Sequence, residues 1–303
     1  MRVSLAASLL MLSGKSIAYF MTHSTAILSD ALESLVHGFA TGFAALSLWY
    51  AAQPADENHP YGHGRIAYFS AGFEGSLVMM ASFSIMYSGI SAFVTGVELD
   101  YIGYGLAITG VLALLNLFLG FSLIHVGKKH DELILVANGR HVLSDMWTSV
   151  AAITGLLLVL ATGWSWLDPL TALVIGGYIM SEGFRLIRES YRGLMDEMDP
   201  AMARQINDIL QAAVAEGRIT SFHQLRCRQI HKDIWIEVHV LLPGDMRTDD
   251  AHDRVLTVER RLMDAFSEKR VHVLTHVEPE NHEQAHPHGI GHAANDPLAS
   301  IGE

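Results

Sequence analysis

The chain has 303 residues, of which 50 % are hydrophobic and 17 % are charged, and its formal net charge is −12. Soluble domains average about 25 % charged residues, so this composition excludes a single soluble domain, a disordered chain and a collagen-like fibre. The basic residues are also unevenly placed, because only nine of the 20 Lys and Arg residues precede Gly193. The sequence therefore predicts a membrane domain over residues 1–192, followed by a soluble domain.

Cysteine content and charge limit the surroundings and partners of the chain. The single cysteine, Cys227, excludes a disulfide scaffold and fits a reducing compartment. The net charge of −12, without a basic cluster, argues against a nucleic-acid partner. We expect the lipid bilayer to be the main partner of the first domain.

Apolar stretches of membrane-spanning length occur six times before residue 193. A bilayer core needs ~20 apolar residues of helix. The six predicted spans are 3–22 with Lys15, 34–55, 75–97, 101–127, 146–167 and 168–187 with Glu182. The first is not a signal peptide, because its apolar stretch continues past Lys15 and no small-residue cleavage site ends it. These stretches predict an all-α transmembrane domain of six helices.

The positions of the basic residues predict the orientation of the six spans. If the amino end lies inside, none of the outside loops holds a Lys or Arg, whereas the inside segments carry Arg65, Lys128, Lys129, Arg140, Arg185, Arg188 and Arg192. This is the positive-inside distribution. It predicts that both termini and the soluble domain face the cytoplasm.

From residue 198 the pattern is that of a small soluble domain. Pro200 begins a helical pattern that Gly217 ends, and a second helical pattern covers 250–266. Apolar strand patterns cover 219–230, 234–242 and 271–277. The αββαβ order predicts a metallochaperone-like α+β domain over 198–280, with one face of its sheet covered by helices. The His-containing residues 281–303 are expected to form a flexible tail, with weak metal binding by its histidines as the alternative.

Ionisable residues inside membrane spans are expensive and are candidates for function. Glu33 and His37 are four residues apart at the start of the second span, and His141 and Asp145 are four apart at the start of the fifth. Two imidazoles and two carboxylates on two helices suit a tetrahedral Zn²⁺ site. The alternative is that they are hydrated residues at the membrane edge. Asp30 is expected either to orient an imidazole or to cap the helix.

The loop after the second span contains a further candidate metal site. Asp56, His59 and His63 follow one another at spacings of three and four residues. This spacing is typical of metal ligands, but Asp and His also occur in hydrated loops without a metal. From spacing alone the two interpretations are equally favoured.

These motifs together resemble those of the cation diffusion facilitators, membrane antiporters that exchange divalent metal for protons. The resemblance rests on the residues from Ser24 to His37, the loop Gln-Pro-Ala-Asp…His-Pro-Tyr-Gly-His-Gly, the His-x-x-x-Asp of the fifth span, and Leu167-Asp168-Pro169-Leu170. It is strongest to the compact bacterial zinc and ferrous-iron efflux type. It implies a homodimer in the bacterial inner membrane.

The resemblance also implies three groups of metal ligands and one charge pair. The transport site falls on Glu33, His37, His141 and Asp145; the loop site on Asp56, His59 and His63; the cytoplasmic site on His223, His239, His252, His276 and Glu278; and the charge pair on Arg65 and Asp196. Relatives usually have Asp or His in place of Glu33, Asp in place of His37, and Asp in place of Glu278. The balance of two imidazoles and two carboxylates favours Zn²⁺ over Mn²⁺, while Fe²⁺, Cd²⁺ and Co²⁺ stay open.

The function hypothesis is therefore export of Zn²⁺ from the cytoplasm in exchange for protons. A passive metal channel or an importer would use the same ligands. An intramembrane zinc protease is disfavoured because the chain contains no His-Glu-x-x-His motif. A sensor that is merely anchored by its spans is disfavoured because an anchor needs no polar ligands inside them.

Overall fold

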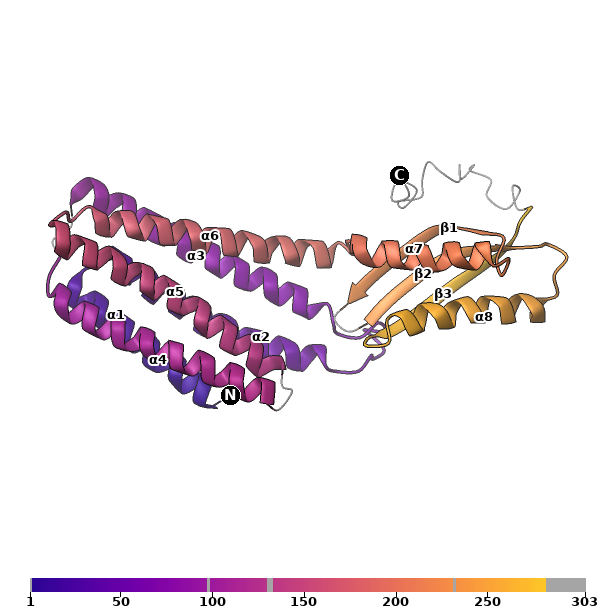
Figure 1. Cartoon of the computed structure of the whole chain (residues 1–303), viewed down its shortest axis with the longest axis horizontal. Helices are drawn as coiled ribbons and strands as arrows, with labels where there is room; N and C mark the ends of the chain where they lie inside the picture. The colour runs from indigo at the N-terminus through magenta and orange to yellow at the C-terminus, as the bar shows by residue number, and fades with distance from the viewer. Residues whose placement is uncertain (1, 97–98, 130–132, 231–232, 282–303) are drawn as a thin grey trace. The chain divides into compact units, whose positions relative to one another are not determined.

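The computed structural model describes residues 2–96, 99–129, 133–230 and 233–281 (Figure 1). The chain divides into two compact units. The first contains Met1–Trp49 and Phe69–Ser190, and the second contains Tyr50–Tyr68 and Tyr191–Glu303. The His-containing tail predicted for 281–303 lies outside the described residues except for Asn281.

The membrane domain is built from six helices. They are α1 (Arg2–Thr22), α2 (Thr25–Ala51), α3 (Ile66–Thr95), α4 (Ile102–Lys129), α5 (Leu133–Thr162) and α6 (Leu167–Leu194). Among the described residues, the helices from α2 to α6 are five that are long and apolar enough to cross a membrane. α1 carries Lys15 within its apolar sequence. The predicted helical transmembrane domain is confirmed.

Three helices begin earlier than the charge-free runs indicate. α2 begins at Thr25 rather than at residue 34, α3 at Ile66 rather than at residue 75, and α5 at Leu133 rather than at residue 146. A charge-free run stops at the first carboxylate, whereas a helix continues through a carboxylate that has a partner. Asp30 in α2 has such a partner, because Lys15 lies 2.7 Å from it inside the bundle.

α2 and α5 lie at the centre of the helical packing. One buried cluster joins α2, α3, α5 and α6 through Ala26, Val78, Ile85, Ala152, Ile175 and Ile179. A second joins α1, α2 and α5 through Ala18, Ile27 and Leu156, with α4 side chains packed against it. The two helices that carry the predicted transport ligands therefore contribute to both clusters.

α3 and α6 cross at a pair of glycines. A Cβ atom on Gly75 would lie 3.0 Å from the carbonyl oxygen of Gly183, and one on Gly183 would lie 3.2 Å from that of Gly75. Small residues allow membrane helices to approach this closely, which maximises van der Waals contact where no hydrophobic driving force acts.

A buried carboxylate from α6 caps the N-terminus of α2. Asp168 accepts hydrogen bonds from the Ser24 hydroxyl at 2.5 Å, the Thr25 amide at 2.8 Å and the Thr25 hydroxyl at 2.7 Å. The first amides of a helix have no partner within the helix, and its N-terminus is the positive end of the helix dipole. Asp168 thus stabilises the start of α2 and ties it to the first turn of α6.

The soluble domain contains a three-stranded sheet with two helices. Its elements are α7 (Pro200–Ala215), β1 (Ser221–Ile230), β2 (Asp233–Leu242), α8 (Thr248–Ala265) and β3 (Arg270–Pro279). The strand order is β1-β2-β3, with β1 antiparallel and β3 parallel to β2. The predicted αββαβ order and α+β class are confirmed.

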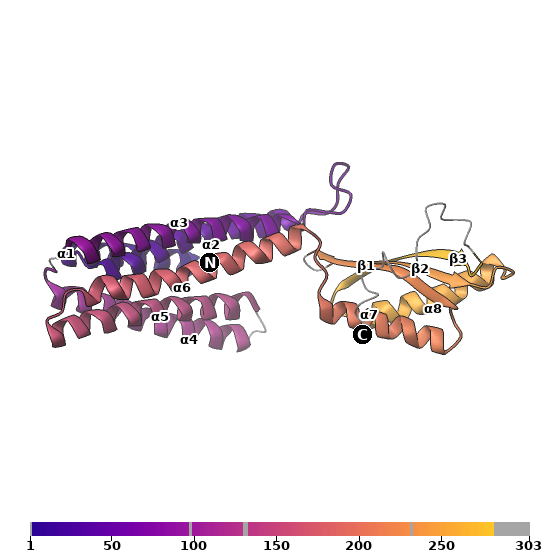
Figure 2. The ribbon, with the colours of Figure 1, turned by 90° about the horizontal axis from the view of Figure 1, so that it is seen from above.

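Both helices of this domain lie on the same face of the sheet (Figure 2). The apolar residues of β2 at alternate positions, Ile234, Ile236, Val238 and Val240, are buried against α7 and α8. Strands alternate their side chains between two faces, so the intervening residues Trp235, Glu237 and His239 belong to the other face. One face of the sheet therefore forms the core, and the other presents polar and aromatic side chains.

Candidate metal sites

Two of the four predicted transport ligands interact electrostatically with the same cation. Glu33 on α2 is buried and Asp145 on α5 is half-buried. Both carboxylates interact electrostatically with the ammonium group of Lys15 on α1. The side chains of His37 and His141 lie outside the described residues, although their backbones belong to α2 and α5.

Asp30 lies in the interior of the bundle and has several partners. It is more than one turn inside α2, so of the two roles expected for it the helix cap is excluded, and the orientation of an imidazole stays a prediction. It pairs with Lys15 and also interacts with the Ser149 hydroxyl at 2.8 Å. In the sequence, Asp30 was a candidate only because it lies three residues before Glu33. The role of Lys15 was not visible, because it lies on a different helix.

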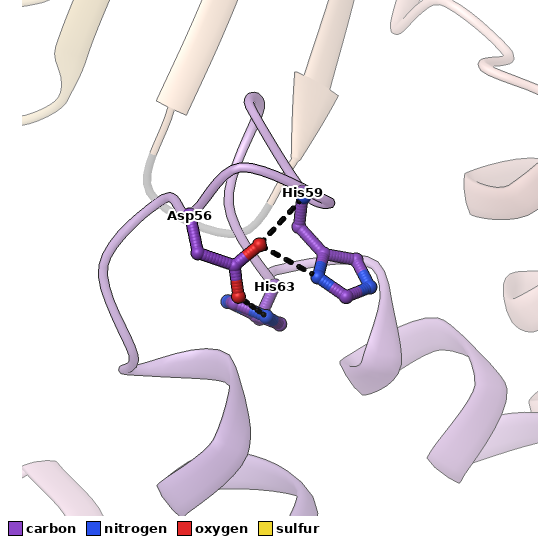
Figure 3. Close-up of side chains that lie close together, drawn as sticks. All are labelled: Asp56, His59 and His63. Atoms are coloured by element: carbon purple, nitrogen blue, oxygen red, sulfur yellow. Dashed lines mark hydrogen bonds and ion pairs between the residues drawn. The ribbon is translucent and has the colours of Figure 1, made fainter.

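The three predicted loop ligands converge on one small volume (Figure 3). The His59 Nδ1 atom lies 3.0 Å from Asp56 Oδ1, and the His63 Nε2 atom lies 3.3 Å from Asp56 Oδ2. One ligand-type atom from each residue lies within 4.8 Å of the others. Asp56 and His59 are exposed, whereas His63 is buried.

Local hydrogen bonds fix the shape of this loop. The Asp56 carboxylate accepts backbone hydrogen bonds from Asn58 at 2.9 Å and His59 at 2.7 Å, which is the turn-forming use of an Asp side chain. The His59 amide, followed by the His59 ring and the Asn58 amide, lowers the pKa of Asp56. Gly62 then adopts a φ of 79°, a conformation that side chains with a Cβ disfavour. The lowered pKa favours the ionised form of the Asp56 carboxylate.

The same loop packs against the sheet of the soluble domain. The Tyr61 ring lies edge-on to Trp235 at a centroid distance of 5.2 Å, and the Arg228 guanidinium lies 5.4 Å from the Tyr61 centroid. The Tyr68 hydroxyl donates to the carbonyl oxygen of Gln229 at 2.9 Å. These contacts explain why the loop belongs to the second compact unit.

Arg65 and Asp196 form an ion pair at the other end of this loop. The Arg65 Nη2 atom donates to both carboxylate oxygens of Asp196, at 2.8 and 2.7 Å. Arg228 also approaches Asp196, at 3.5 Å. Because the Arg65 and Asp196 side chains are 45 % and 31 % exposed, the pair contributes only about 0.2–1 kcal/mol to stability. The ion pair connects the end of the loop to the residues that follow α6.

The third cluster lies on the sheet of the soluble domain. His223 on β1 and His239 on β2 are Cα partners, and the Glu278 carboxylate of β3 lies 3.4 Å from His223 Nε2 and 2.8 Å from His239 Nδ1. His276 approaches the same carboxylate at 3.4 Å but is exposed. The ligand-type atoms of His223, His239 and Glu278 lie within 4.8 Å of one another.

His252 is placed apart from the cluster on the sheet. It lies on α8 with an exposed side chain, and the described residues of a single chain form the three-residue group without it. The sequence pattern alone could not separate a ligand on the sheet from one on the helix surface.

The donor atoms of both described clusters suit Zn²⁺. Each contains two imidazoles and one carboxylate, and Zn²⁺ is bound by such groups at about 2.0–2.2 Å. Three protein ligands leave a position open in a tetrahedral site. The donor chemistry therefore fits zinc or a similar divalent transition metal, and a tetrahedral ion at either cluster would take one further ligand.

Comparison with known proteins assigns both domains. Residues 1–195 match the cation efflux transmembrane domain, and residues 201–280 match the cytoplasmic domain of cation efflux proteins. An uncharacterized transporter of Synechocystis sp. is 35 % identical, over 91 % of this chain and 88 % of its own length. The cation-efflux pump FieF of Shewanella oneidensis is 27 % identical over 92 % of each chain.

Two further matches add a transporter and a solved structure. The cadmium, cobalt and zinc/H⁺-K⁺ antiporter of Bacillus subtilis is 24 % identical over 93 % of this chain and 89 % of its own length. The Zn form of the putative zinc transporter CzrB is 29 % identical, covering 28 % of this chain and 92 % of its own, with a TM-score of 0.26. The family matches cover both domains, and the chain belongs to the cation diffusion facilitator family of integral membrane metal transporters.

Proposed function

We propose that this protein exports Zn²⁺ from the cytoplasm in exchange for protons. Membership of the cation efflux family establishes transport of divalent metal, and the metal, the coupling ion and the direction are the proposal. The observation that supports it is that Glu33 and Asp145, on two different membrane helices, both interact electrostatically with the Lys15 ammonium group. Carboxylates inside a membrane are costly and mark ion pathways.

The ligand set supports zinc as the principal substrate. With His37 and His141 completing the site, the metal would meet two imidazoles and two carboxylates. Imidazole suits Zn²⁺, whereas Mn²⁺ prefers sites richer in oxygen. Cd²⁺, Co²⁺ and Fe²⁺ are the second candidates, and the Bacillus subtilis relative is named for cadmium, cobalt and zinc.

Proton exchange follows from the chemistry of the ligands. A metal ion binds neutral imidazole and ionised carboxylate, so loading the site releases protons. In the proposed cycle Zn²⁺ enters from the cytoplasm and displaces protons from the site. The helices then expose the site to the opposite side, where protons displace the metal. An inward proton gradient thereby drives metal outward.

The loop and sheet clusters are proposed as regulatory sites in a homodimer. The cytoplasmic-domain family match supports dimer formation. Because His252 is exposed and outside the three-residue group of one chain, a second copy is a source of the fourth ligand. Metal bound there would hold the two cytoplasmic domains together. The distribution of Lys and Arg supports an inner-membrane protein with both termini in the cytoplasm.

Transport into proteoliposomes tests the proposed function. Zn²⁺ uptake is followed with an internal fluorescent indicator while a pH gradient is imposed in either direction. We expect uptake to accelerate when protons leave the vesicles, and Glu33→Ala and Asp145→Ala to abolish it. A Zn²⁺ uptake rate that does not change with the pH gradient would instead favour a passive channel. Uptake that persists in both variants would remove these residues from the transport site.

A further inference from the structure

The pair of Lys15 and Asp30 is the most deeply buried ion pair in the described part of the chain. The two side chains are 1 % and 0 % exposed, and the Lys15 Nζ atom lies 2.7 Å from Asp30 Oδ1. A buried ion pair stabilises a protein only weakly unless further hydrogen bonds satisfy its remaining atoms. Lys15 makes such a bond by donating to the Ser34 hydroxyl at 2.8 Å.

Hydroxyl groups of α5 complete the environment of Asp30. Ser149 lies 2.8 Å from Asp30 and 3.3 Å from the Asp145 carbonyl, whereas Thr148 lies 3.3 Å from Asp30 and 2.8 Å from that carbonyl. Each hydroxyl has one hydrogen to donate. The distances assign the Ser149 hydrogen to Asp30 and the Thr148 hydrogen to Asp145.

This network is attached to the helical turns that carry Glu33 and Asp145. Ser34, which binds Lys15, follows Glu33 directly, and Asp30 lies three residues before Glu33 on the same helical face. On α5, Thr148 binds the backbone of Asp145 itself. The Lys15 ammonium also attracts the Glu33 and Asp145 carboxylates.

We propose that Lys15 determines metal selectivity by holding Asp30 away from the transported ion, and so positions a site with two carboxylates rather than three. This inference rests on the proposed transport site at Glu33 and Asp145. Lys15 is a positioning residue, because it acts through Asp30 and Ser34.

The physical reason is the cost of an unpaired buried carboxylate. If Lys15 loses its charge, Asp30 remains buried without a counter-charge, and the nearest available cation is the metal ion one helical turn away. The metal would then be drawn toward a third carboxylate. A site with more oxygen ligands, and so a smaller share of imidazole ligands, favours Mn²⁺ over Zn²⁺.

The test compares Zn²⁺ and Mn²⁺ uptake by full-length protein in proteoliposomes. We expect Lys15→Met to raise the ratio of Mn²⁺ to Zn²⁺ uptake at least about fivefold. This is the lower end of the change in affinity that one site typically causes at another. Lys15→Met combined with Asp30→Asn should return the ratio toward the wild-type value, because no carboxylate is left to release. Lys15→Arg, which retains the charge, should keep the wild-type ratio.

Three results would overturn the inference. One is an unchanged ratio in Lys15→Met, with or without an equal loss of both activities, which would show a merely structural role. The second is a raised ratio in the double variant. The third is a raised ratio in Asp30→Asn alone. This variant also tests the inference if Lys15→Met fails to fold in detergent. Glu33→Ala separates the two proposals: if it leaves uptake intact, the transport site itself is wrong, whatever the Lys15 variants do.

Discussion

His223 and His239 face each other across the β1–β2 ladder, with their ring centroids 5.1 Å apart. Glu278 of the third strand reaches both rings. Since each donor comes from a different strand of one hydrogen-bonded sheet, strand register alone holds the three side chains together. Preorganised ligands lose little conformational entropy on binding.

His239→Ala should therefore weaken Zn²⁺ binding at the soluble domain at least about tenfold. Loss of a residue that only supports a metal ligand already lowers metal affinity by about tenfold or more, and loss of a ligand should lower it at least as much. Calorimetric titration of the full-length protein in detergent, with Glu33 and His59 replaced to remove other sites, would measure it. His272→Ala is the matched control, because His272 also lies on the sheet but outside the cluster. Equal affinity in the two variants would refute the assignment.

Asp168→Asn should destabilise the membrane domain by about 1–3 kcal/mol, because an amide cannot accept all the hydrogen bonds that converge on the buried carboxylate. The donors are the Ser24 hydroxyl and both the amide and hydroxyl of Thr25. The midpoint of thermal unfolding in detergent would report the loss. Asp208→Asn, at an exposed position of α7, is the control and should leave the midpoint unchanged. A midpoint equally unchanged in Asp168→Asn would contradict the role of the carboxylate as a cap.

Cys227 should be unreactive in the native protein. Burial, together with the charge of Asp199, raises the pKa of the Cys227 thiol to about 12, so the reactive thiolate is scarce at pH 8. We expect native protein to resist iodoacetamide at pH 8 and urea-unfolded protein to react fully, as measured by intact mass. Rapid alkylation of the native chain would show that the β1 strand opens readily.

Glu216 should make the soluble domain sensitive to strong acid. Hydrogen bonds from Arg261 and Arg218 lower the pKa of Glu216 to about 2. A depressed native pKa contributes stability that is complete above the unfolded value, near 4.3, and is lost as the pH falls toward about 2. Glu216→Gln should therefore lose less stability than wild type between pH 5 and pH 2. Urea unfolding of the full chain at both values would measure it, and identical pH dependence in the two proteins would contradict the pairing.

Much of the fold follows from patterns that a single stretch of sequence contains. Apolar runs predicted the membrane helices, and alternation in β2 predicted a sheet covered on one face. The starts of α2, α3 and α5 were placed too late, because a charge-free run stops at a carboxylate. In α2 the helix extends through residues whose partners are distant in sequence, Lys15 for Asp30 and Asp168 for Thr25. Contacts of this kind leave no local periodicity.

The candidate sites also divide into those that a local sequence pattern predicts and those that depend on distant contacts. Asp56, His59 and His63 lie within one turn-forming loop, so their spacing alone suggested a cluster. His223, His239 and Glu278 are brought together by strand register, which required the resemblance to a family to anticipate. His252 shows the limit of that resemblance for one chain, because its exposed position on α8 separates it from the three-residue group.

The central claim is that Glu33 on α2 and Asp145 on α5 converge on one metal ion. It is tested most directly by replacing both with cysteine in a Cys227→Ser background and adding Hg²⁺, which bridges two neighbouring thiols. We predict that a single Hg²⁺ binds per chain and protects both thiols from maleimide, as read by intact mass. A control pairing Glu33→Cys with Thr154→Cys, at an exposed position farther along α5, should not be protected. Free labelling of both thiols in the Glu33 and Asp145 pair would contradict the account.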